Sequence, residues 1–149
     1  MSDERPYISV EVRRAVFERA RWLCEYCRSP EAIGTVSFQI EHIVPYSSGG
    51  SSDLWNLACS CPGCNSHKAM RVTATDPATG TTMPLFNPRD QIWSEHFVWN
   101  EDFTQIIGQT ATGRATVAAL LLNRHGLQNL RRVLVLDGAH PPVEIENTL

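Results

Sequence analysis

The sequence lacks any apolar run that approaches the roughly 18–20 residues of a membrane-spanning helix. Its first residues are charged and lack the apolar core of a signal peptide. No internal repeat is apparent. We therefore expect a cytoplasmic protein with no membrane partner. In that compartment the five cysteines are expected to be thiolate ligands or core residues rather than disulfides.

The chain also lacks a net positive charge, and Lys68 is its single lysine. A formal net charge of −3 argues at first against a nucleic-acid partner, but the distribution of charge matters more than its sum. Arginines gather in two groups, at residues 13–28 and 114–132, and no acid lies between the first and last members of the second group. These arginines are either solvated helix faces or candidate contacts to a nucleic-acid backbone.

A length of 149 residues and a hydrophobic content of 42% suit one soluble domain. The patterns predict an α+β fold, with helices over 10–23, 65–72, 112–123 and 127–136, strands over 35–40, 93–99 and 104–108, and a short strand or turn over 53–57. We divide the chain into a core over about 10–72, a linker over about 73–90, a C-terminal extension over about 91–136 and a tail over 137–149.

Two Cys-x-x-Cys pairs frame the middle of the core. Cys24 and Cys27 form the first pair, and Cys61 and Cys64 form the second. Paired thiolates at this spacing are typical of a tetrahedral structural zinc site, which here would join the two ends of the intervening segment. The alternatives are a redox dithiol or simply buried cysteines. Cys59 stands at the wrong spacing in apolar context, so we expect it in the core.

Between the cysteine pairs, Glu41 and His42 stand side by side at the end of a predicted strand. Phosphodiester hydrolysis needs an activated water and stabilisation of developing negative charge, which a histidine base and a divalent cation can supply. Glu41 offers a hard oxygen ligand suited to Mg²⁺ or Mn²⁺, and Asn65 could supply another oxygen. Adjacent strand residues point to opposite faces, so the two side chains can take different roles.

The whole pattern resembles the HNH endonuclease family, in the branch with a Cys₄ zinc site. The resemblance covers about residues 24–68 and rests on Cys24-x-x-Cys27, Glu41-His42-Ile43-x-Pro45, Gly49-Gly50, Asn56-Leu57 and Cys61-x-x-Cys64-Asn65-x-x-Lys68. It implies a ββα-metal (His-Me finger) core, flanked here by an N-terminal helix and a C-terminal strand and helix extension. It also implies cleavage or nicking of DNA with one divalent cation, leaving 5′-phosphate and 3′-hydroxyl ends.

The resemblance implies a role for each matching position. His42 is the general base that activates water, and Glu41 is a ligand of the catalytic Mg²⁺ or Mn²⁺. Asn56 is the central asparagine, which orients the loop and the histidine. Asn65 takes the third signature position as a metal ligand, which makes the chain an H-N-N variant. His67, two residues further on, is the alternative ligand.

Lys68 and Arg71 are the expected contacts to nucleic-acid phosphate. Segments of the C-terminal part over 85–132, such as Asn87-Pro-Arg-Asp90 and Leu122-Asn-Arg124, look like a tail of some bacterial HNH proteins, and their role does not follow from the sequence. Three alternatives stay open: a zinc-stabilised nucleic-acid-binding module without catalysis, an RNA-directed nuclease, and a redox dithiol protein. The oligomeric state is either monomer or homodimer.

Overall fold

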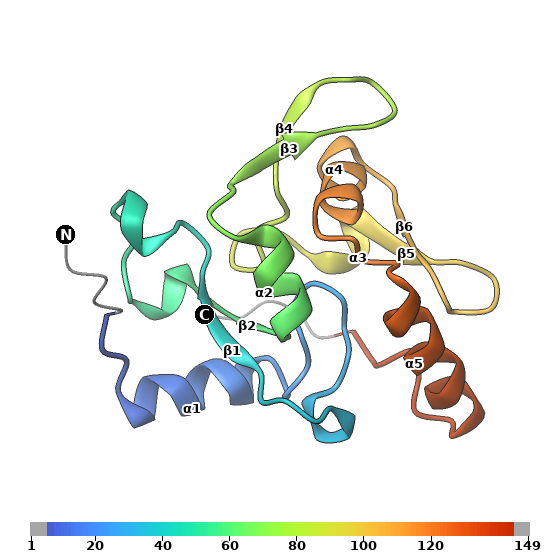
Figure 1. Cartoon of the computed structure of the whole chain (residues 1–149), viewed down its shortest axis with the longest axis horizontal. Helices are drawn as coiled ribbons and strands as arrows, with labels where there is room; N and C mark the ends of the chain where they lie inside the picture. Colours follow the sequence, from blue (N-terminus) through green and yellow to red (C-terminus); the bar gives the residue numbers. More distant parts are fainter. Residues whose placement is uncertain (1–5, 145–149) are drawn as a thin grey trace.

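The computed structural model describes residues 6–144 and confirms a mixed α and β fold built around small antiparallel sheets (Figure 1). Its helices are α1 (Val10–Arg19), α2 (Pro62–Lys68), α3 (Trp93–His96), α4 (Ala111–Ala119) and α5 (His125–Leu136). Its strands are β1 (Gln39–His42), β2 (Leu57–Ser60), β3 (Thr73–Thr75), β4 (Thr82–Pro84), β5 (Phe97–Trp99) and β6 (Ile106–Gly108). Short 3₁₀ turns lie at Glu31–Ile33, Tyr46–Ser48 and Leu54–Asn56.

Helix α1 begins at an N-cap and ends earlier than its periodicity predicts. The Ser9 hydroxyl accepts a hydrogen bond from the Val12 amide at 3.1 Å, as expected for this cap. Val16 is buried where the helix packs on β2. Arg21 and Trp22 adopt positive φ angles of 52° and 59°, which no helix can continue. This turn delivers the chain to the first cysteine pair.

The central motif forms a ββα unit. Strand β1 pairs antiparallel with β2, with His42 opposite Leu57 and Glu41 opposite Ala58. Helix α2 starts directly after β2 and contacts β1 (Figure 1). Cys61 caps α2 by accepting a hydrogen bond from the Cys64 amide at 3.4 Å. The first strand is shifted from its predicted range of 35–40, because it begins at Gln39 and ends at His42, so Glu41 and His42 belong to the strand itself.

The segment over 73–90, expected to be a linker, is folded. Strands β3 and β4 form a hairpin in it, and the following Leu85 and Phe86 enter the hydrophobic core. Asp76, at the end of β3, is fully buried and binds the Arg114 guanidinium of α4 through two contacts of 2.9 Å. The arginine holds the pKa of the Asp76 carboxyl well below its usual range. Composition suggested a linker because it cannot show such long-range partners.

The C-terminal extension shares one core with the ββα unit. A β5–β6 hairpin packs against α4, and α3 precedes β5 where the sequence predicted strand from Trp93 onward. The Phe86 ring lies edge-on to Tyr26 of the first cysteine knuckle, with centroids 6.5 Å apart, and to Phe97 at 5.2 Å. These contacts make the hydrophobic cluster continuous from the knuckle to the extension.

The expected tail over 137–149 is packed in its first part. His140 is buried, lies edge-on to the Trp99 ring at 4.5 Å, and hydrogen-bonds the Phe103 carbonyl at 2.9 Å. The remainder of that prediction, residues 145–149, lies outside the described residues. Between residues 6 and 144, no helix has both the length and the apolar character that crossing a bilayer requires.

Phe86→Ala should lower the stability of the whole chain, because its ring joins the knuckle to the extension. Truncating a buried phenylalanine costs about 3–5 kcal/mol, and we expect one cooperative transition shifted to lower denaturant concentration. Val98→Ala, on the exposed face of the β5–β6 hairpin, should change stability by less than about 0.5 kcal/mol. Chemical denaturation with zinc present measures both. Two separate transitions in the wild type would contradict a shared core.

Candidate functional site

The four paired cysteines come together in one buried cluster. The sulfur atoms of Cys24, Cys27, Cys61 and Cys64 all lie within 4.8 Å of one another. Their knuckles come from distant segments, one after α1 and one at the start of α2. Cys59 is fully buried but is not a member of the cluster, as expected for a core residue.

The cluster fits a zinc ion. Zinc–sulfur bonds of about 2.3 Å in a tetrahedron place neighbouring sulfurs about 3.8 Å apart, and the Cys27 and Cys61 sulfurs are 3.7 Å apart. A redox dithiol requires two sulfurs only, whereas four converge here. The Ser29 hydroxyl lies 3.0 Å from the Cys27 sulfur, so one thiolate also has a local hydrogen-bond donor. Zinc bound there would fix the spacing between the two knuckles.

His42 lies half-buried at the end of β1, with its ring toward the loop that follows. Its Nε2 atom is 3.0 Å from the Ser52 hydroxyl, and its ring centroid is 6.0 Å from that of Tyr46. Burial lowers the pKa of His42 below its ordinary value of 6.5. The imidazole is therefore neutral at neutral pH, which is the form that can accept a proton from water.

Asn56 ties together the two ends of that loop. Its carboxamide accepts from the Val44 amide at 2.9 Å and donates to the Val44 and Ser51 carbonyls at 3.0 and 2.8 Å. Only 1% of Asn56 is exposed. Gly50 passes so close that a Cβ there would overlap the Val44 carbonyl. These hydrogen bonds fix the conformation of the loop, which places the Ser52 hydroxyl beside the His42 ring.

Glu41 points away from the loop and into the core. It is 4% exposed, and its Oε1 lies 2.6 Å from the ammonium of Lys68, which is itself 1% exposed. Lys68 also donates to the Ile43 carbonyl at 2.9 Å. Burial raises the pKa of the Glu41 carboxyl, and the lysine offsets part of that rise. Burial, followed by the Glu41 charge, raises the pKa of the neighbouring Tyr26 hydroxyl well above its usual value.

The remaining predicted residues lie along or just after α2. The Asn65 carboxamide donates to the Gln39 side chain of β1, and His67 is half-buried on the same helix. Arg71 is exposed and donates to the Ala119 carbonyl at 2.8 Å. The side chains of Glu41 and Asn65 therefore contact different protein partners, Lys68 and Gln39. Their joint role as ligands of a catalytic cation stays a prediction.

The second arginine group is mostly neither a solvated helix face nor a set of free contacts for a nucleic-acid backbone, which were the two alternatives that the sequence left open. Four guanidinium groups have partners within the protein. Arg28 contacts Trp93 and Glu144, and Arg114 binds Asp76. Arg124 contacts the cysteine cluster, and Arg131 contacts the Trp99 ring and the Thr104 carbonyl. The exposed members are Arg13, Arg14, Arg21 and Arg132. Most of the second group is therefore structural, a correction that arginine spacing alone could not supply.

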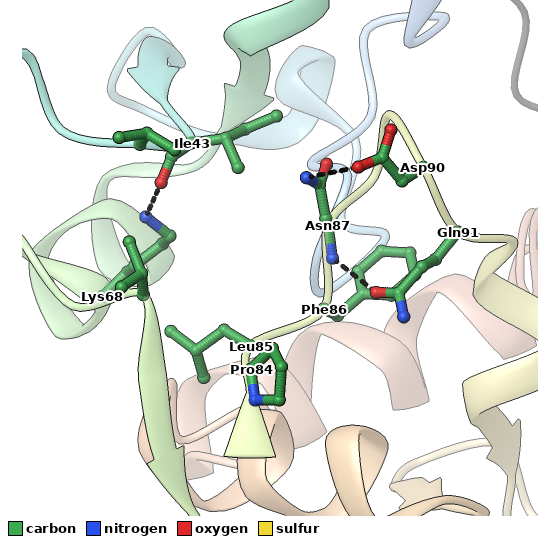
Figure 2. Close-up of a pocket in the computed structure, with 10 residues that line it drawn as sticks. Ile43, Lys68, Pro84, Leu85, Phe86, Asn87, Asp90 and Gln91 are labelled. Carbon is green, nitrogen blue, oxygen red and sulfur yellow. Dashed lines mark hydrogen bonds between the residues drawn. The ribbon is translucent and has the colours of Figure 1, made fainter. Parts of the chain in front are cut away.

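A pocket of about 270 Å³ lies at the seam between the ββα unit and the segment after β4. Figure 2 shows Lys68 and Ile43 on one side, with Asn87 opposite. Asn87 is bonded to Asp90 and Gln91. Among its described lining residues, Lys68 is the one predicted site residue. The pocket is mostly apolar, and the predicted base does not line it.

Some residues at these sites were not found by sequence reasoning. Ser52 lies in a serine- and glycine-rich loop, where no pattern distinguishes it from its neighbours. Tyr26 sits inside the first knuckle, and its burial against Glu41 depends on the fold. Arg124 reaches the cluster from 60 residues beyond Cys64, and no spacing rule spans that distance.

The fold and the site define a protein of mixed α and β structure with a central ββα unit, four cysteines placed to hold a metal ion, and a histidine at the end of β1. Residues 24–71 match the family described as HNH endonuclease. The match to an HNH endonuclease domain is confined to those residues, and the cysteine cluster is consistent with the zinc-containing branch of that family. The chain is also similar to a protein named anaredoxin from Nostoc sp. (strain PCC 7120), with 29% identity over 65 residues, covering 44% of this chain and 80% of that protein.

Cys24→Ser should abolish stoichiometric zinc binding and unfold the core, because three thiolates no longer complete the tetrahedron. Cys59→Ala is the matched control, since it removes a buried thiol outside the cluster. We expect the control to keep about one zinc per chain, as a single four-thiolate site requires. Elemental analysis and circular dichroism measure these outcomes. Equal zinc content in both variants would contradict the assignment.

Glu41→Leu should destabilise the protein by about 3–5 kcal/mol, because it leaves the buried Lys68 ammonium without its partner. The double variant Glu41→Leu/Lys68→Met should recover most of that loss, since two apolar side chains replace the ion pair. Urea denaturation of the zinc-loaded proteins measures the coupling. Additive losses in the double variant would show that the two side chains are energetically independent.

Proposed function

We propose that this protein is a divalent-metal-dependent DNA endonuclease. His42 takes a proton from water, which attacks the phosphorus of a phosphodiester bond, and the products carry 5′-phosphate and 3′-hydroxyl ends. The observation that carries the proposal is the neutral, half-buried His42 beside a loop held by Asn56, inside an HNH domain. That domain implies an interaction with nucleic acid, and we take DNA as the substrate. A cytoplasmic location and a monomer or homodimer remain expectations.

The geometry favours different roles for the side chains on the two faces of β1. His42 faces the loop side and is accessible, whereas Glu41 faces the core and binds Lys68. We propose Glu41 and Asn65 as ligands of a catalytic Mg²⁺ or Mn²⁺, with His67 as the alternative to Asn65. A cation at Glu41 competes with the Lys68 ammonium for the same carboxylate, so loading it requires that ion pair to open. The cation would stabilise negative charge on the phosphate.

We propose that Arg71 and Lys68 contact nucleic acid, although the two side chains differ in exposure. Arg71 is exposed just after α2, so a phosphate needs only to compete with the carbonyls of His67 and Ala119 for its guanidinium. Lys68 is enclosed, so its contact with a phosphate depends on the same opening that frees Glu41. The exposed arginines of α1, Arg13 and Arg14, supply further positive charge.

The direct test is cleavage of supercoiled plasmid by the zinc-loaded chain with Mg²⁺, Mn²⁺ or EDTA. We expect metal-dependent nicking or linearisation, and loss of at least about 10²-fold in rate for His42→Ala, the usual contribution of a general base. His125→Ala, an exposed histidine on α5, is the matched control and should cleave like the wild type. Equal cutting by His42→Ala would contradict the assigned base.

The Glu41 role is tested by Glu41→Gln in the same assay, with folding checked by circular dichroism, because the amide can still bond Lys68 but lacks the negative charge that holds a cation. Loss of cleavage by the folded variant supports the cation at Glu41, whereas cleavage at the wild-type rate excludes it. If every variant and the wild type bind DNA yet none cuts any DNA or RNA strand form, the protein is a zinc-stabilised binding module. Cleavage of RNA alone would make it an RNA-directed nuclease.

A further inference from the structure

Arg124 brings the C-terminal extension into direct contact with the cysteine cluster. Its Nη2 atom lies 3.3 Å from the Cys61 sulfur and 3.8 Å from that of Cys64, and its Nη1 atom lies 3.6 Å from the Cys64 sulfur. Both sulfurs belong to the second knuckle. The guanidinium is part-buried and also donates to the Leu120 and Leu121 carbonyls at 3.3 and 3.2 Å.

The helix beside the cluster is shaped to receive this side chain. Gly63 lies between the two cysteines of the second knuckle, in α2. A Cβ on Gly63 would overlap the Nη2 atom of Arg124. The absence of a side chain at Gly63 therefore leaves the space that the guanidinium fills, and α2 gives up some helix propensity at that position.

The surrounding chain holds Arg124 in place. It precedes α5 directly, and the neighbouring Asn123 bonds both backbone groups of Ile106 in β6, at 2.7 and 2.8 Å. The buried Arg131 donates to the Leu122 carbonyl at 2.7 Å. The segment that carries Arg124 is therefore anchored to the extension on one side and to the cluster on the other.

We propose that Arg124 is the hydrogen-bond donor to the zinc-bound thiolates of Cys61 and Cys64, and that this contact couples zinc binding to the docking of the extension. Four thiolates and one Zn²⁺ carry a net charge of about −2 in a buried site. A guanidinium in direct contact compensates part of that charge, and its planar fork can reach two sulfurs at once. Groups that hydrogen-bond metal ligands commonly tune affinity.

The test measures zinc affinity of the full chain by competition with a chromogenic chelator. Arg124→Met should weaken zinc binding by roughly 10–100-fold, the usual effect of removing a group that supports metal ligands. Arg132→Met is the matched control, because that arginine is exposed on α5 and bonds only the Asn129 side chain among the described contacts. Its affinity should equal that of the wild type. Wild-type affinity in Arg124→Met would overturn the proposal.

Two further variants separate the contact from a general effect on folding. Gly63→Ala displaces the guanidinium without removing its charge, and alanine favours the helix more than glycine does. As a single substitution, Gly63→Ala should weaken zinc binding. Added to Arg124→Met, it should have no further effect on zinc affinity. Arg124→Lys keeps the positive charge but loses the planar guanidinium, so its zinc affinity should lie between those of the wild type and Arg124→Met. It replaces Arg124→Met in the test if the methionine variant does not fold. An additive effect of Gly63→Ala would overturn the direct contact.

Hydrogen exchange tests the coupling to the extension. With zinc saturating, Arg124→Met should raise amide exchange rates in α5 relative to the wild type, while those of α1 stay unchanged. Weaker zinc binding with unchanged exchange in α5 would leave Arg124 as a donor to the thiolates and overturn the coupling.

Discussion

The convergence of two cysteine knuckles is the constraint on which the rest of this structure depends. The knuckles are 34 residues apart at Cys27 and Cys61, and the strand, loop and strand between them carry the candidate catalytic residues. Fixing both ends of that segment removes much of the conformational freedom that would otherwise disperse His42 and Asn56. The extension adds a third element to the same cluster through Arg124. One buried centre thus joins the two knuckles and the extension, beside the hydrophobic core that they share.

Strand β1 divides the chemistry into two sides. The alternation of a strand sends His42 toward the loop and Glu41 toward α2 and the core. On the loop side, Asn56 and Gly50 keep the backbone rigid around the histidine. On the core side, the Glu41–Lys68 pair is almost fully enclosed, and its electrostatic cost is offset by mutual attraction and the Ile43 carbonyl. In the proposed nuclease, a cation and the lysine compete for this one carboxylate.

Local patterns predicted the centre of the molecule well and its periphery poorly. The cysteine spacing predicted the cluster, and alternation placed Glu41 and His42 at a strand end, because both signals act over a few residues. The hairpin after α2 was missed because its stability comes from Asp76 binding Arg114, 38 residues away. The enclosure of Lys68 was missed for the same reason: sequence shows a charge but not what surrounds it.

The proposed function requires a catalytic cation at Glu41 and Asn65 that is separate from the structural zinc ion at the four cysteines. Nuclear magnetic resonance of the zinc-loaded protein titrated with Mn²⁺ tests it directly, because a bound paramagnetic ion broadens nearby resonances. We expect the resonances of Glu41, His42 and Asn65 to broaden first and those of Arg124 to broaden only at higher Mn²⁺ concentration, while zinc stays bound. Broadening centred on Arg124 with release of zinc, or no localised broadening at any Mn²⁺ concentration, would contradict it.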